Sequence, residues 1–125
     1  IKYQYQFHID PVPNNKHGLS HYRIYVDGSD VTEAMKTFSG QSYTTYGYFN
    51  QTMIVNYVFD LTADTTDASA GKFSNWTGAK EIMVKARRYD SGHAIELNGN
   101  IWRDGTGASG NFLWNRPLLT IQALS

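Results

Sequence analysis

Apolar and polar residues alternate with a period of two along most of the chain, which is the pattern of half-buried β-strands. The clearest run is residues 2–9, where Tyr3, Tyr5, Phe7 and Ile9 share one face. The same alternation returns in residues 22–26, 53–61, 82–87, 94–98 and 119–123. No helical periodicity longer than two turns is present, and residues 31–35 suit either a short strand or one helical turn.

These segments and the turn signals between them predict an all-β chain. Pro11 ends the first run because proline cannot donate to a ladder, and Asp27-Gly28 marks a tight turn. Residues 53–61 are apolar on both faces and predict a central strand, whereas residues 62–78 predict the longest loop. The expected architecture is an antiparallel β-sandwich, jelly-roll-like, of about 7–9 strands. At 125 residues we expect one domain over 1–125.

Charge and composition narrow the function classes. Eleven basic and eleven acidic residues give no net charge, so the sequence predicts no nucleic-acid partner. The absence of cysteine excludes disulfides and thiolate chemistry. The longest apolar runs have about three residues, which predicts no membrane insertion. The start at Ile1, together with abundant Tyr, Thr, Ser, Asn and Gly, suggests a mature or excised module that is secreted or displayed at the cell surface.

Catalytic patterns fail on context, so we expect no enzyme. The three glutamates and most aspartates fall on predicted strands or turns rather than in facing pairs. A glycine pattern at residues 105–110 has neither the preceding strand nor the following helix of a dinucleotide site. Zinc binding by His8, His17, His21 and an aspartate stays open as an alternative.

Aromatic residues make up 14% of the chain, and several fall in polar segments where a core does not explain them. The apolar face of a pyranose stacks on an aromatic ring, while its hydroxyl groups need short polar or charged partners. Residues 88–104, RYDSGHAIELNGNIWRD, supply this mixture, with residues 90–93 expected at the tip of a tight hairpin. The predicted ligand-binding residues are Trp76, Arg88, Tyr89, Asp90, His93, Asn98, Trp102 and Asp104.

Two further interpretations depend on individual residues. Trp102 and Trp114 suit either the core or a ligand, whereas Trp76, between Asn75 and Thr77, is expected to be exposed. Weak calcium candidates are Asp60, Asp64 and Asp67 in an oxygen-rich loop that does not match the EF-hand pattern. No other cofactor is expected.

In length, strand rhythm, aromatic and polar loops, and turns such as Tyr25-Val26-Asp27-Gly28, the whole chain resembles secreted β-sandwich lectins and carbohydrate-binding modules. The resemblance extends over the full length of the chain. It implies non-catalytic binding of a glycan or polysaccharide, and an oligomer would strengthen weak single sites. The alternative is a structural or adhesive extracellular module that mediates protein–protein contacts.

Overall fold

A computed structural model describes residues 1–11, 16–17, 19–39, 51–90, 93–98 and 116–124. In this part the chain is all-β apart from one 3₁₀ turn, η1 (Ala68–Ala70). The strands are β1 (Lys2–Pro11), β2 (Lys16–His17), β3 (Leu19–Val26), β4 (Ser29–Ser39), β5 (Gln51–Val58), β6 (Ile82–Arg88), β7 (His93–Leu97) and β8 (Leu118–Gln122). The described residues include no helix long and apolar enough to cross a membrane.

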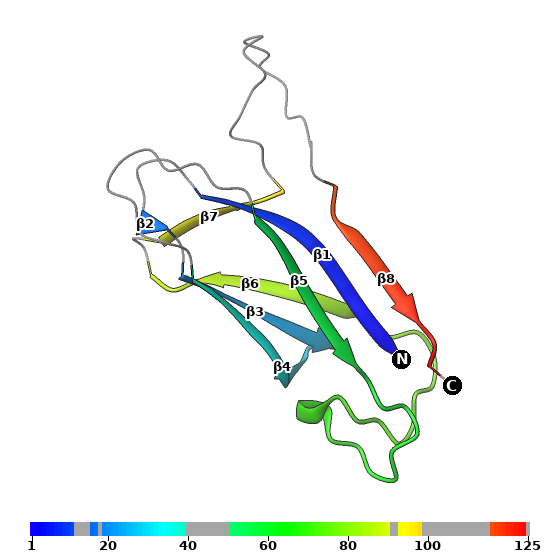
Figure 1. The fold of residues 1–125 in the computed structure, drawn as a ribbon. Helices are drawn as coiled ribbons and strands as arrows, with labels where there is room; N and C mark the ends of the chain where they lie inside the picture. Colours follow the sequence, from blue (N-terminus) through cyan, green and yellow to red (C-terminus); the bar gives the residue numbers. More distant parts are fainter. Residues whose placement is uncertain (12–15, 18, 40–50, 91–92, 99–115, 125) are drawn as a thin grey trace.

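Two antiparallel three-stranded sheets make up the main body (Figure 1). In the first, β1 lies between β5 and β8. In the second, β3 lies between β4 and β6. The short strand β7 continues the first sheet beside the end of β1, and the two-residue β2 pairs with it in parallel. The main body therefore has six strands, fewer than expected, because β2 and β7 only extend one end of a sheet.

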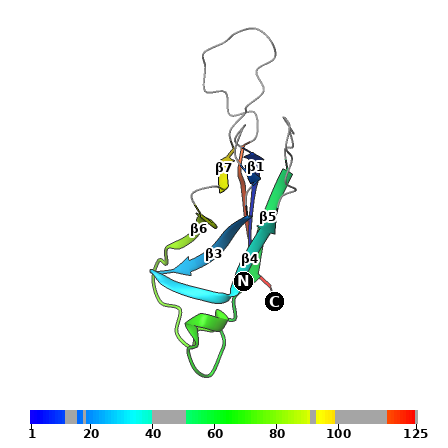
Figure 2. The ribbon, with the colours of Figure 1, turned by 90° about the vertical axis from the view of Figure 1, so that its left-hand side faces the viewer.

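The two sheets pack their apolar faces together in a β-sandwich-like arrangement, which Figure 2 shows with β6 and β3 to one side of β1 and β5. As the alternation predicts, Phe7 of β1 and Tyr22 of β3 are buried, and their ring centroids lie 5.1 Å apart. The buried cluster is Tyr3, Phe7, Ile9, Tyr22, Ile24, Val26, Val31, Ala34, Phe38, Val55 and Phe59. One face of β3 is buried, and Ile82 and Val84 of β6 pack against the same core, so the alternate residues of these two strands point outward.

The turn between β3 and β4 forms where Asp27-Gly28 predicts it. Both residues have positive φ, 46° and 82°, as a two-residue hairpin turn of type I′ requires. The Asp27 carboxylate accepts a hydrogen bond from the Glu81 backbone N–H at 2.9 Å and pairs with the Lys80 ammonium at 2.9 Å. These contacts hold the start of β6 against the end of β3 and help to fix the register between the two strands.

The structure differs from the sequence-based expectations in the place of β5 and in the pairing of β6 and β7, and it resolves the ambiguity of residues 31–35. Residues 31–35 belong to a strand, β4, which carries an irregularity opposite Tyr22 and Ile24. The strand β5 is at the edge of its sheet in the described chain, so the expectation of a central strand is wrong. Its second apolar face is exposed, with Ile54 at 44% and Val58 at 55%. The hairpin expected around residues 90–93 is also wrong, because β6 and β7 pair in different sheets.

Candidate functional site

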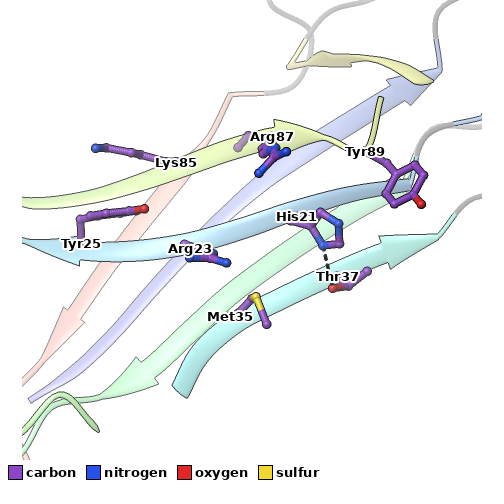
Figure 3. A pocket seen from close by; sticks show the side chains of 9 residues that line it. His21, Arg23, Tyr25, Met35, Thr37, Lys85, Arg87 and Tyr89 are labelled. Atoms are coloured by element: carbon purple, nitrogen blue, oxygen red, sulfur yellow. Dashed lines mark hydrogen bonds between the residues drawn. The ribbon is translucent and has the colours of Figure 1, made fainter. Parts of the chain in front are cut away.

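The outer face of the β4–β3–β6 sheet forms a groove of about 540 Å³, which we call the outer groove. Its described lining is His21, Arg23, Tyr25, Met35, Thr37, Lys85, Ala86, Arg87 and Tyr89. Figure 3 shows these side chains in three rows, one on each strand. The volume falls in the range of ligand pockets in general, about 300–1,000 Å³.

Strand alternation and register bring these residues together. In β3, His21, Arg23 and Tyr25 alternate with buried residues, so they share the outer face. Lys85 and Arg87 of β6 follow the same period along the outer groove, and Tyr89 continues it just beyond the end of the strand. The antiparallel register places His21 opposite Arg87 and Arg23 opposite Lys85. Directly paired residues project to the same side of a sheet, so the outward side chains of β3 and β6 form one cluster.

Contacts within the outer groove orient several of its side chains. The His21 Nδ1 atom is 3.1 Å from the Thr37 hydroxyl, across the pairing of β3 with β4 (Figure 3). The Lys85 ammonium lies 4.0 Å from the centroid of the Tyr25 ring, a cation–π contact. Tyr89 is 56% exposed, and its backbone N–H donates to the Leu19 carbonyl at 2.8 Å. This bond continues the pairing with β3 just beyond the end of β6.

The outer groove is electrically positive. Its described lining carries three side chains with a fixed positive charge, Arg23, Lys85 and Arg87, and no carboxylate. The Arg23 guanidinium is paired with Asp30, which lies outside the lining and raises the pKa of the arginine by hydrogen bonding and by its charge. Lys85 and Arg87 form no ion pair among the described residues. The two charges therefore face solvent without a carboxylate partner there.

Three of the residues predicted from the sequence lie together where β6 ends. Tyr89 lines the outer groove, whereas Arg88 and Asp90 are exposed beside it and do not line it. The register pairs Arg88 with the buried Ser20, on the opposite side of the sheet from Arg87. His93 begins β7, with its side chain outside the described part. Trp102, Asp104 and Trp114 also lie outside the described residues.

Asn98 and Trp76 make structural contacts away from the outer groove. The Asn98 side-chain oxygen accepts a hydrogen bond from the His8 backbone N–H at 3.0 Å, and its own N–H donates to the His8 carbonyl. Trp76 is partly buried rather than fully exposed. Its ring centroid lies 5.0 Å from that of Phe73 and 6.5 Å from that of Phe59. Both residues therefore take part in holding loops to the core.

The acidic loop between β5 and β6 uses two of its three calcium candidates for backbone contacts. Asp60 accepts hydrogen bonds from the N–H and hydroxyl of Thr62, and these bonds lower the pKa of its carboxyl group. Asp67 caps η1 by accepting from the hydroxyl and N–H of Ser69 and the N–H of Ala70, which lower its pKa in the same way. Among the described residues, no three His, Asp or Glu side chains gather around one point where a metal ion would fit.

Of the residues that line the outer groove, only Tyr89 is among the ligand-binding residues predicted from the sequence. The signal of the outer groove is present in HYRIYV and in MVKARRY, where polar and aromatic residues occupy the positions opposite the core. The two rows become a site only when β3 and β6 are known to be neighbours. They are separated by more than fifty residues of chain, and the alternation within each strand does not specify its partner. No family model, curated protein or solved structure matches this chain.

Proposed function

We propose that this chain is a jelly-roll-like β-sandwich that binds carbohydrate without catalysing a reaction, at the outer groove of the β4–β3–β6 sheet. One observation carries the proposal: tyrosine rings and hydrogen-bonding basic side chains gather on an exposed sheet face. Rings suit the apolar face of a sugar, and charged or polar groups suit its hydroxyl groups. Secretion or cell-surface display agrees with this role, since extended glycans are accessible there.

The shape of the outer groove supports an extended ligand. From Tyr25 to His21, and from Lys85 to Tyr89, each strand advances four residues, which is roughly 13 Å at ~3.3 Å per residue. Tyr25 and Lys85 are at one end and Tyr89 is at the other (Figure 3). This spacing suits a segment of a glycan chain better than a single monosaccharide. Residues on regular strands also keep a more fixed geometry than residues on loops.

A glycan array probed with the purified chain, with and without EDTA, tests the proposal. We expect binding to at least one glycan class in both conditions, and weaker binding by Tyr89→Ala. The control is Trp76→Ala, which removes an aromatic ring outside the outer groove. An array without any bound glycan would overturn the proposal, and binding lost only with EDTA would favour the calcium interpretation of residues 60–67.

A second candidate is an adhesive module that associates with further copies of itself. The observation in its favour is β8, which pairs only with β1 in the described chain. Its apolar side chains Leu118, Leu119 and Ile121 are 55%, 52% and 58% exposed. Leu119 and Ile121 share one face of β8, and exposed apolar side chains on one face are common at protein contacts. Sedimentation velocity over a range of concentrations discriminates: self-association that Leu119→Ser abolishes, with no glycan bound, would favour this candidate.

A further inference from the structure

We propose that the outer groove selects anionic polysaccharides, whose sulfate or carboxylate groups pair with Lys85 and Arg87, over neutral ones. The inference rests on the proposed carbohydrate binding and adds the chemical class of the ligand. It is based on the positive charge of the outer groove. This local charge is not visible in the net charge of the whole chain, which is zero.

The charge of the outer groove is unbalanced. Of its three fixed positive charges, that of Arg23 is neutralised by Asp30, while Lys85 and Arg87 have no carboxylate within salt-bridge distance in the described chain. His21 faces Arg87 in the register and adds a ring that can donate or accept a hydrogen bond. A neutral sugar would leave these charges without counterparts. An anionic sugar would supply them, and charge-assisted hydrogen bonds are about twice as strong as neutral ones.

Lys85 and Arg87 present two cations from one strand, an arrangement that suits an anion repeated along a chain. Lys85 and Arg87 are two residues apart on one strand, so their Cα atoms are separated by roughly 7 Å. Both side chains are exposed and extend from the same face. The guanidinium of Arg87 presents a planar set of donors that matches a sulfate or carboxylate with two parallel bonds. A polysaccharide with an acidic group in each repeat would place successive anions along this row.

A polysaccharide fits the outer groove better than a single-stranded nucleic acid does. Nucleic-acid binders of this kind combine a basic track with several rings on which bases stack. The described lining of the outer groove has two tyrosine rings, Tyr25 and Tyr89, at opposite ends rather than side by side. In the described lining only Lys85 and Arg87 lack a carboxylate partner, and the chain has no net charge to attract a densely phosphorylated strand. The balance of rings and charges therefore favours an acidic glycan.

Dextran sulfate and dextran provide a matched pair of probes, because they share a backbone and differ in charge. Affinities for both are measured by isothermal titration calorimetry at about 50 mM and about 200 mM salt. We expect dextran sulfate to bind at least about tenfold more tightly than dextran, and the preference to shrink at the higher salt concentration. Polygalacturonate tests carboxylate against sulfate, and an oligodeoxythymidylate tests the nucleic-acid alternative.

Adjacent arginines provide the matched variants. Arg87→Met removes a charge that lines the outer groove, and Arg88→Met removes the same charge one residue away, outside the lining. We expect Arg87→Met to weaken dextran sulfate binding by about tenfold and Arg88→Met to change it by less than about twofold. Lys85→Met should resemble Arg87→Met. Circular dichroism of each variant shows that the fold is retained.

The outcomes separate this inference from the function beneath it. Equal affinity for dextran sulfate and dextran, together with a neutral glycan bound on the array, would overturn the inference and leave the proposed function standing. Equal losses in Arg87→Met and Arg88→Met would overturn the location of the site. Binding of oligodeoxythymidylate as tight as that of dextran sulfate would overturn the choice of a polysaccharide. An absence of all glycan binding would overturn both proposals.

Discussion

The Lys85 ammonium lies over the ring of Tyr25, 4.0 Å from its centroid, and joins β6 to β3 on the outer face of their sheet. The contact is diagonal, because the register pairs Lys85 with Arg23 and Tyr25 with Met83. Diagonal neighbours on a sheet are within reach of long side chains and aromatic rings. The contact therefore holds one cation of the outer groove near a defined position while the ammonium stays open to solvent.

This contact predicts a small and specific coupling between the two residues. Exposed cation–π pairs contribute about 0.5–1 kcal/mol, so Lys85→Met should lower the free energy of unfolding by no more than about 1 kcal/mol. In the double variant Lys85→Met, Tyr25→Leu, the second substitution should cost less than it does alone. Urea unfolding of the four proteins gives the coupling energy. A coupling of zero would show that the cation–π contact does not contribute in solution.

The strands could be predicted from the sequence because burial on one face leaves a direct periodic trace. Tyr3, Phe7 and Ile9 in β1, and Tyr22, Ile24 and Val26 in β3, are buried as the alternation indicates. The order of the strands within each sheet has no comparable periodic pattern in the sequence. The apolar second face of β5 suggested burial on both sides, yet Val58 is 55% exposed at a sheet edge. Pairing between distant strands depends on contacts that no local pattern contains.

The candidate site was harder to predict for the same reason. Arg87 and Arg88 are adjacent residues of the same type. Successive residues of a strand point to opposite faces, so the two arginines lie on opposite faces of β6. Tyr89 was identified from its ring beside polar residues, whereas the sequence offers His21 only as an alternative zinc ligand, and its place in the outer groove follows from the pairing of β3 with β6. The polar setting of Trp76 suggested exposure, but its ring packs on Phe73 and Phe59. The polarity of adjacent residues therefore does not predict the exposure of a side chain, because its contacts in space depend on the fold.

Gly71 should be the least replaceable of the described glycines with positive φ. Its φ is 63°, and an added Cβ would lie 2.5 Å from a ring carbon of Tyr57, whose hydroxyl donates to the Ala70 carbonyl. Gly71→Ala therefore combines backbone strain with overpacking, and we expect a loss of about 2–4 kcal/mol of unfolding free energy.

Gly78→Ala is the matched control for this substitution. Its φ is 74°, but nothing lies within 4 Å of the added Cβ, so only the backbone strain of about 1–2 kcal/mol applies. Thermal and urea unfolding compare the two variants. Equal losses of unfolding free energy in the two variants would show that the Tyr57 ring moves aside without a cost in stability.

The buried hydroxyl pair of Ser20 and Tyr22 predicts an asymmetry between single and double variants. The Ser20 hydroxyl donates to the Tyr22 hydroxyl at 3.1 Å, and both residues are fully buried. Tyr22→Phe leaves the serine unsatisfied and should cost about 1–3 kcal/mol. Adding Ser20→Ala should recover part of that loss, since both polar groups are then removed. Urea unfolding measures this recovery, and a double variant with the full sum of the single losses would contradict it.

Trp76 should affect stability and leave glycan affinity unchanged. Replacing a fully buried aromatic residue with alanine costs about 3–5 kcal/mol, and this ring is only partly buried against Phe59 and Phe73. We therefore expect Trp76→Ala to lose about 2 kcal/mol. Tyr89→Ala should show the opposite behaviour, with weaker binding and little loss of stability. Calorimetric titration and unfolding of both variants are the measurements. Weaker binding by a folded Trp76→Ala would return Trp76 to the ligand site.

Three aspartates predict a loss of stability at acid pH. Hydrogen bonds from Lys80 and the Glu81 backbone lower the pKa of Asp27, and bonds from Thr62 and Ser69 lower those of Asp60 and Asp67. A carboxyl group with a lower pKa in the folded state binds protons more readily when unfolded. Its contribution is therefore complete above the unfolded pKa, near 3.8, and disappears as the pH falls through the folded value.

The measurement is the urea midpoint from about pH 6 down to about pH 2. We expect the native chain to lose stability below about pH 4, and the triple variant Asp27→Asn, Asp60→Asn, Asp67→Asn to lose less over the same interval. Asp64→Asn is the control, because Asp64 is exposed in the same loop and makes no hydrogen bond among the described residues. It should follow the native profile. If the urea midpoint of the triple variant falls at acid pH as much as that of the native chain, other groups cause the acid sensitivity.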